Sequence, residues 1–216
     1  MRKYLTELIG TFFLVLTIGM TVIGGKGDFA PIAIGAILMA MVFAGGYISG
    51  AHYNPAVTLA VLIRGKISAG DAVVYMIVQI VGGCAAGLVV DYMAGATVVN
   101  TIAIADTTRG IIGELAGTFA LAFVVLNVAT AVGTSGNSFY GLAIGFTVLS
   151  MAYAFGGISK GAFNPAVAVS LSVMHFAPWS DIWVYIVGCF TGGALAGIAF
   201  RFINTDENPP VQKTRA

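Results

Sequence analysis

Two short stretches decide how this chain folds: Tyr53-Asn54-Pro55-Ala56-Val57 and Phe163-Asn164-Pro165-Ala166-Val167. Each is a helix-start signal, because Asn is a favoured N-cap and Pro is favoured at the first helical position. The apolar segments that begin there, residues 54–63 and 164–173, hold ten residues each. As helices they would measure about 15 Å, roughly half of the hydrocarbon core of a bilayer. Neither can span a membrane alone, but two that enter from opposite faces could together cross it once.

Other segments repeat together with these motifs. Residues 7–12, Glu-Leu-Ile-Gly-Thr-Phe, recur at 114–119 as Glu-Leu-Ala-Gly-Thr-Phe, and Ala-Ile-Gly at 33–35 recurs at 143–145. Several matches in the same order indicate a duplication. We therefore expect one repeat at about 4–92 and a second at about 109–203.

Composition predicts an all-α membrane protein. Of the 216 residues, 58% are hydrophobic and only 9% are charged, and the mean hydropathy is +0.95. A soluble domain needs more charge to cover its surface, and the apolar runs here reach membrane-spanning length. Three transmembrane helices are expected in each repeat, at 4–24, 31–48 and 71–90 and at 109–132, 139–155 and 180–202. Since the number of crossings is odd, the second repeat should be inverted relative to the first.

The basic residues predict the orientation. Seven fall on the side that holds both termini and three on the other, and the side richer in Lys and Arg is normally cytoplasmic. We expect an integral protein of the plasma or inner membrane with both termini in the cytoplasm. The seven are Arg2, Lys3, Arg64, Lys66, Arg201, Lys213 and Arg215, and the three are Lys26, Arg109 and Lys160.

Glycine-rich segments precede both motifs, at 45–50 and 156–161. We expect them to be non-helical. Irregular backbone at membrane depth is tolerated only where protein buries it or where it lines water, so these segments should line an aqueous path. The inverted symmetry should bring the two helix starts together at the bilayer centre. Their positive dipole ends would repel cations, while the two Asn amides donate hydrogen bonds to one water molecule. The expected pore constriction is Asn54, Pro55, Ala56, Asn164, Pro165 and Ala166.

In these residues the chain resembles the aquaporins, the major intrinsic protein family. The segment 49–58, Ser-Gly-Ala-His-Tyr-Asn-Pro-Ala-Val-Thr, is similar to the first signature of that family, and the resemblance extends from Glu7 to about Phe202. It implies six helices and two re-entrant half-helices around a pore, in one channel domain over residues 1–204 with a cytoplasmic tail at 205–216. It also implies a passive channel for water, not an enzyme, that assembles as a homotetramer.

The resemblance assigns supporting roles to three polar residues. Glu7 and Glu114 are carboxyl groups inside the first helix of each repeat, where an ionisable side chain is a candidate for function. In the family such glutamates accept hydrogen bonds from the half-helix loops and hold them in place. The resemblance puts His52 at the pore wall near the cytoplasmic mouth, where we expect packing and one hydrogen bond.

The selectivity filter departs from the family pattern. Most aquaporins follow the second Asn-Pro-Ala with Arg, which narrows the outer mouth and adds a charge and donors, but this chain has Val167. Glycerol facilitators usually place Asp next, where this chain has Ala168. Aligned on the family, the other filter positions are Ile34, Ala152 and Gly161. A wide, apolar filter of this kind should pass urea, ammonia, hydrogen peroxide or glycerol beside water.

Two other function classes remain as alternatives. A secondary transporter also uses inverted repeats and broken helices, and an anion channel would be compatible with positive dipole ends in the pore. The transporter would normally carry a charged residue at the midplane, and none stands beside Asn54 or Asn164 in the sequence. No cysteine and histidine cluster indicates a metal, so we expect no metal and no cofactor. The net charge of +1 gives no basic field for nucleic acid.

Overall fold

The computed structural model describes residues 1–25, 27–95 and 102–205, and these residues form helices joined by turns and loops. The predicted tail over 205–216 and three of the counted basic residues, Lys26, Lys213 and Arg215, lie outside the described residues, apart from residue 205. The helices are α1 (Arg2–Val22), α2 (Ala30–Ser49), α3 (Pro55–Arg64), α4 (Ala69–Ala94), α5 (Thr107–Thr130), α6 (Tyr140–Ser159), α7 (Pro165–Val173) and α8 (Ile182–Ile203), with short 3-10 turns η1 (Gly27–Phe29), η3 (Val132–Thr134) and η4 (Trp179–Asp181).

Six of these helices are long and apolar enough to cross a membrane. The prediction of six transmembrane helices is confirmed, with ends shifted by a few residues; α4, for example, runs four residues beyond its predicted end at residue 90. The two short helices are also confirmed, with ten residues in α3 and nine in α7. The fold is therefore all-α, with six spanning helices and two half-length ones.

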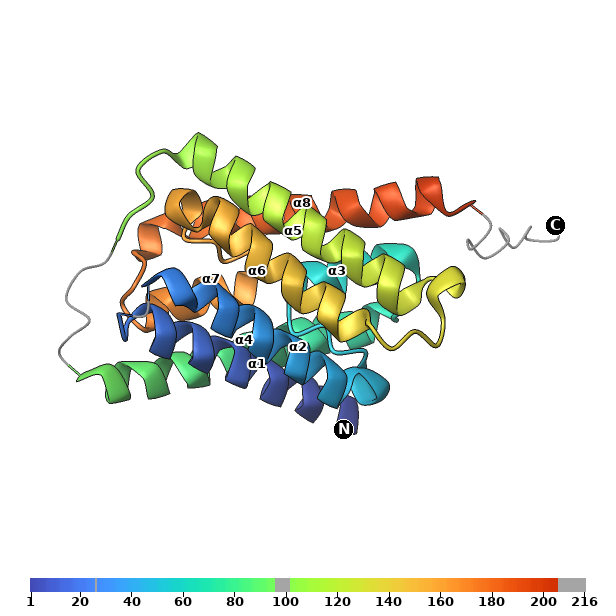
Figure 1. Ribbon diagram of the computed structural model, residues 1–216, viewed down its shortest axis with the longest axis horizontal. Coiled ribbons are helices and arrows are strands. Elements are labelled where there is room, and N and C mark those ends of the chain that lie inside the picture. The colour runs from blue at the N-terminus through green and yellow to red at the C-terminus, as the bar shows by residue number, and fades with distance from the viewer. Residues whose placement is uncertain (26, 96–101, 206–216) are drawn as a thin grey trace.

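The long helices run along the long axis of the molecule (Figure 1). At one end of the bundle, called here the near end, α1 begins and α8 ends. At the opposite, far end lie η1 and the last turn of α6. The short helix α3 lies toward the near end and α7 toward the far end, so the half-helices start in the middle and point in opposite directions (Figure 1).

The duplication is visible in the packing. Helix α1 packs along α4 as α5 packs along α8, and each half-helix packs on a long helix of the other repeat, α3 on α8 and α7 on α4. Glycines allow this close approach. A Cβ atom added at Gly193 of α8 would lie 2.4 Å from the carbonyl oxygen of Ala56, and one at Gly83 of α4 would lie 2.6 Å from Ser170 Oγ. Small residues at helix contacts are the usual means of tight packing in membranes.

The glycine-rich segments differ from the prediction. They were expected to be non-helical over 45–50 and 156–161, but α2 continues to Ser49 and α6 to Ser159. The physical reason is that a helix satisfies its own backbone groups, so continuing it is the least costly choice at membrane depth, and glycine is common in such helices. Both helices end on a left-handed residue, Gly50 (φ +87°) and Lys160 (φ +73°). The irregular connections are thus short.

The α1–α4 contact gives a stability prediction. A Cβ added at Gly82 would lie 2.5 Å from the backbone carbonyl oxygen of Leu8, which cannot rotate away, whereas one added at Gly70 in the same helix meets no atom within 4 Å. We expect Gly82→Ala to lower the free energy of unfolding by roughly 1–3 kcal/mol through overpacking. Gly70→Ala should be neutral or stabilising, because Ala is the better helix former. Thermal unfolding of both variants in detergent measures this, and equal melting temperatures for the two would contradict the packing described.

Candidate functional site

The starts of the two half-helices meet in the middle of the bundle. Asn54 caps α3: its Oδ1 accepts hydrogen bonds from the backbone N–H groups of Ala56 at 2.8 Å and Val57 at 3.4 Å. Its Nδ2 donates to the backbone oxygen of Phe163 at 2.8 Å, which belongs to the loop ahead of the other half-helix. The Asn54 side chain therefore caps its own half-helix and also binds the loop that precedes the other half-helix.

The second repeat makes the same pair of contacts in reverse. Asn164 caps α7 by accepting from the N–H of Ala166 at 2.9 Å, and its Nδ2 donates to the backbone oxygen of Tyr53 at 2.9 Å. Both Asn side chains are buried yet line a cavity. Each amide NH2 group has two N–H donors and uses one in these contacts, so one donor per Asn remains for a molecule in the cavity.

Two aromatic residues hold the loops in an unusual conformation. Tyr53 and Phe163, directly before the Asn residues, have left-handed φ angles of +50° and +47°. Such backbone persists only where its surroundings over-determine it. Here each ring fills the space left by a glycine of the first helix in its repeat: a Cβ on Gly10 would lie 2.1 Å from the Tyr53 ring, and one on Gly117 would lie 2.3 Å from the Phe163 ring.

Glu7 accepts four hydrogen bonds around the first loop and is fully buried. One carboxylate oxygen accepts from Ser49 Oγ at 2.6 Å and from the N–H of His52 at 3.0 Å. The other accepts from the N–H of Tyr53 at 2.7 Å and from Gln79 Nε2 at 2.8 Å. The carboxylate thus satisfies two loop N–H groups that no helix can reach.

Glu114 occupies the equivalent place around the second loop and is also fully buried. It accepts from Ser159 Oγ at 2.6 Å, from the N–H of Ala162 at 3.0 Å and from the N–H of Phe163 at 2.6 Å. Its fourth donor is the thiol of Cys189 at 3.4 Å, in place of the amide of Gln79. The two carboxylates thus accept the same number of hydrogen bonds, but one donor to Glu114 is a thiol, which donates more weakly than an amide.

A cavity of about 310 Å³ runs from the far end of the bundle to the Asn pair. Its lining includes all four positions aligned as a filter, Ile34, Ala152, Gly161 and Val167, together with Asn54 and Asn164. Most of the remaining wall consists of apolar side chains of α1, α2, α5 and α6. Among the described residues that line it, two are charged, Asp28 and Lys160, both at the far mouth.

His52 and Val125 lie where this cavity meets a second one. Both residues line the first cavity and also a cavity of about 430 Å³ that opens at the near end. The His52 ring nitrogen Nδ1 is 3.1 Å from Thr58 Oγ1, and the ring packs edge-on against Tyr75 with centroids 5.2 Å apart. The two cavities therefore adjoin at these wall residues, and the first of them extends along the Asn pair.

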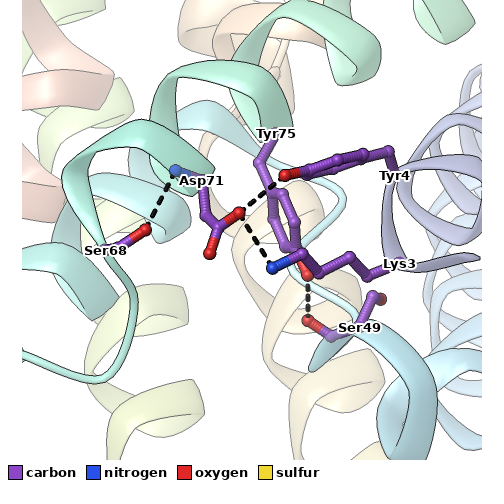
Figure 2. Close-up of polar contacts among 6 residues, drawn as sticks. All are labelled: Lys3, Tyr4, Ser49, Ser68, Asp71 and Tyr75. Carbon is purple, nitrogen blue, oxygen red and sulfur yellow. Dashed lines mark hydrogen bonds and ion pairs between the residues drawn. The ribbon is translucent and has the colours of Figure 1, made fainter. Parts of the chain in front are cut away.

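The near mouth is built by a polar network that sequence reasoning missed (Figure 2). Asp71 Oδ1 binds Lys3 Nζ at 2.8 Å and accepts from the Tyr4 hydroxyl at 2.6 Å, which joins α1 to α4. Ser68 caps α4 by accepting from the Asp71 N–H at 3.1 Å. The Tyr75 hydroxyl donates to the backbone oxygen of Ser49 at 2.8 Å. The Ser-x-x-Asp spacing, a helix-start pattern, was the signal available in the sequence.

The contacts of Glu114 give a prediction for Glu114→Gln, a change that keeps the size of the side chain and alters its hydrogen bonding. In Glu114→Gln an amide NH2 group replaces one acceptor oxygen and faces donors, so at least one buried N–H or O–H loses its partner. We expect a loss of roughly 1–3 kcal/mol in the free energy of unfolding. Asp91→Asn is the same chemical change at a carboxylate that makes no side-chain hydrogen bond or ion pair with the described residues, and it should stay within about 0.5 kcal/mol of the wild type. Thermal unfolding in detergent tests both, and a Glu114→Gln variant as stable as the wild type would refute the role of these bonds.

Comparison with known proteins places the chain in a family. The profile described as "Major intrinsic protein" matches residues 1–200. The "Glycerol uptake facilitator protein-like 6" of Lactiplantibacillus plantarum is 35% identical over 96% of this chain and all of that protein. The "Probable aquaporin NIP4-2" of Arabidopsis thaliana is 30% identical over all of this chain and 79% of its own length.

A solved structure supports the fold. The aquaglyceroporin of Plasmodium falciparum superposes with a TM-score of 0.79 over 95% of this chain and 98% of that one, at 20% sequence identity. At that identity the likeness shows the arrangement of helices alone. The profile match and the 35% identical relative establish, with the six helices long enough to span a bilayer, that this chain is an integral membrane protein of the major intrinsic protein family.

Proposed function

We propose that the chain is a passive channel for water and small neutral solutes, with no enzymatic activity. The observation that supports the proposal is a pair of cavities that adjoin at His52 and Val125, one opening at each end of the bundle. Asn54 and Asn164 line the first cavity, and each keeps one N–H donor for a molecule there. The names of the relatives, an aquaporin and a glycerol facilitator, agree with a channel of this class.

Ions are excluded at the middle of the path in this proposal. The N-termini of α3 and α7 face it, and each helix start carries a positive partial charge of about half an elementary charge. A cation there meets two positive ends and no carboxylate that is free to compensate, because the oxygens of Glu7 and Glu114 already accept four hydrogen bonds each. A neutral molecule that accepts hydrogen bonds can use the two remaining Asn donors.

The far part of the path selects by size in this proposal. Ile34, Ala152, Gly161 and Val167 line it and offer no side-chain donor. These four side chains cannot distinguish solutes by hydrogen bonds, so urea, ammonia and hydrogen peroxide should pass with water. Glycerol is a further candidate because of the name of the bacterial relative, although Val167 and Ala168 give its hydroxyl groups no charged partner.

Orientation and assembly are also proposals. The basic residues counted in the sequence favour a cytoplasmic near end, in a plasma or inner membrane. Lys3 and Lys66 line the cavity there, in agreement with that count. A homotetramer is proposed from the family resemblance, and α1 and α4 offer exposed apolar side chains to lipid or to neighbouring copies, among them Leu5, Phe13, Val73, Ile77 and Val81.

The two alternatives differ in what they would transport. A secondary transporter would couple solute movement to an ion, and an anion channel would carry current through the positive helix ends. Stopped-flow measurements on proteoliposomes separate these from a passive channel. We expect the wild type to shrink and swell in water and urea gradients without any ion gradient. A chain that passes water but excludes urea and other small solutes would overturn the wide filter, and solute flux that requires an ion gradient would favour the transporter.

Val167 gives the sharpest variant for this proposal. Val167→Arg adds bulk and a fixed charge to a filter that lacks both, so we expect urea flux to fall by about tenfold or more and water flux by less, since each 1.4 kcal/mol of barrier is tenfold. Val167→Met adds length without charge and should reduce urea flux less than Arg does. The measurement is stopped-flow light scattering with water and urea gradients. Equal urea flux in all three proteins would mean that Val167 is not at the filter.

A further inference from the structure

Lys160 is the one cation among the described residues that line the far cavity. It follows α6 directly, precedes the filter position Gly161 and lines the same cavity as Val167. Its side chain is half-buried, and no ion pair joins it to a carboxylate among the described residues. A solute in the cavity therefore passes a lysine whose charge no such pair neutralises.

The backbone at Lys160 is one that glycine adopts more easily. Its φ of +73° is left-handed, a conformation that is uncommon for residues other than Gly, Asn and Asp. The equivalent position in the first repeat is Gly50, with a φ of +87°, separated from Lys160 by the offset that relates Asn54 to Asn164. Both positions thus have a left-handed backbone, but the first repeat has glycine there and the second has lysine. Backbone strain of this kind tends to gather at functional positions.

Asp28 is the other charged residue in the described lining of this cavity. It lies in η1, and its backbone oxygen accepts a hydrogen bond from the Tyr153 hydroxyl of α6 at 2.6 Å. This bond ties η1 to α6, the helix that Lys160 follows directly. Asp28 is exposed to solvent, whereas Lys160 is half-buried beside the filter, so water screens the lysine charge less.

We propose that Lys160 is a specificity-determining residue: its ammonium repels cations at the far mouth and donates hydrogen bonds to the carbonyl oxygen of neutral solutes. It supplies, one residue before Gly161, a fixed positive charge that Val167 does not provide. The inference rests on the proposed function, because it assigns a second point of cation exclusion in the same path. At 0.1 M salt the Debye length is roughly 10 Å, so the charge of Lys160 acts on ions that enter the cavity next to it.

Guanidinium and urea make a matched pair of probes, since both are small and planar and they differ in charge. The experiment compares their uptake at millimolar concentration into proteoliposomes, using isotope-labelled solutes. We expect Lys160→Gln and Lys160→Gly to raise the ratio of guanidinium to urea flux by about tenfold, the order expected when one unit charge beside a mouth is removed. Lys160→Arg keeps the charge and should keep the ratio.

Arg109→Gln is the matched control. Arg109 lies in the first turn of α5, a helix that begins at the far end (Figure 1). Its side chain is 77% exposed and paired with Asp106, and it is not among the residues that line the cavity. Its removal should leave the ratio unchanged. If Arg109→Gln raised the ratio as much as Lys160→Gln, a general surface charge would explain the effect and the inference would be wrong.

Two further readouts separate charge from structure. Lys160→Gly puts glycine, which adopts the left-handed backbone conformation easily, in place of a residue that does so rarely. The variant should therefore melt at the same or a higher temperature while its guanidinium flux rises. Higher salt should also shrink the difference between wild type and Lys160→Gln, because salt screens the charge. A ratio that stays at the wild-type value in both the Gln and Gly variants overturns the inference. If the wild type passes no urea, the proposed function fails, and guanidinium flux alone then decides on Lys160.

Discussion

The structure depends on two buried carboxylates that satisfy irregular backbone at membrane depth. The N–H groups of His52 and Tyr53 lie in the loop between α2 and α3, outside any helix, and Glu7 accepts a hydrogen bond from each. Glu114 does the same for Ala162 and Phe163. Because an unpaired buried N–H costs roughly 1–3 kcal/mol, a broken membrane helix needs such an acceptor. With the loops fixed, the two Asn side chains can cap their helices and cross to the opposite loop.

The sequence was sufficient to predict most of this arrangement. Motif spacing and hydropathy predicted six spanning helices, two half-length ones and their inversion, and the family resemblance pointed to Glu7 and Glu114. The extent of α2 and α6 could not be read correctly, because glycine looks like a helix breaker unless one weighs the cost of unpaired backbone in a membrane. The link between Lys3 and Asp71 was also missed, since partners so distant in the sequence are brought together only by the packing of α1 on α4.

The two repeats have similar backbone conformations, but the side chains at some equivalent positions differ in polarity and charge. Gln79 of the first repeat corresponds to Cys189 of the second, and both face the carboxylate of their own loop. Gly50 corresponds to Lys160, so both loops begin with a left-handed residue, but only the far loop begins with a charged one. An inverted repeat places such differences at opposite ends of the bundle. The two ends therefore differ in polar chemistry, while the Asn pair in the middle keeps equivalent contacts in both repeats.

The central claim is that one path carries water while the paired helix starts hold back ions. The most direct test measures both properties on the same purified wild-type protein: osmotic shrinkage of proteoliposomes and current across a planar bilayer. The account predicts water flux well above that of protein-free vesicles together with no cation current above the bilayer background. Cation current that accompanies the water flux, or vesicles that shrink no faster than protein-free ones, would contradict it.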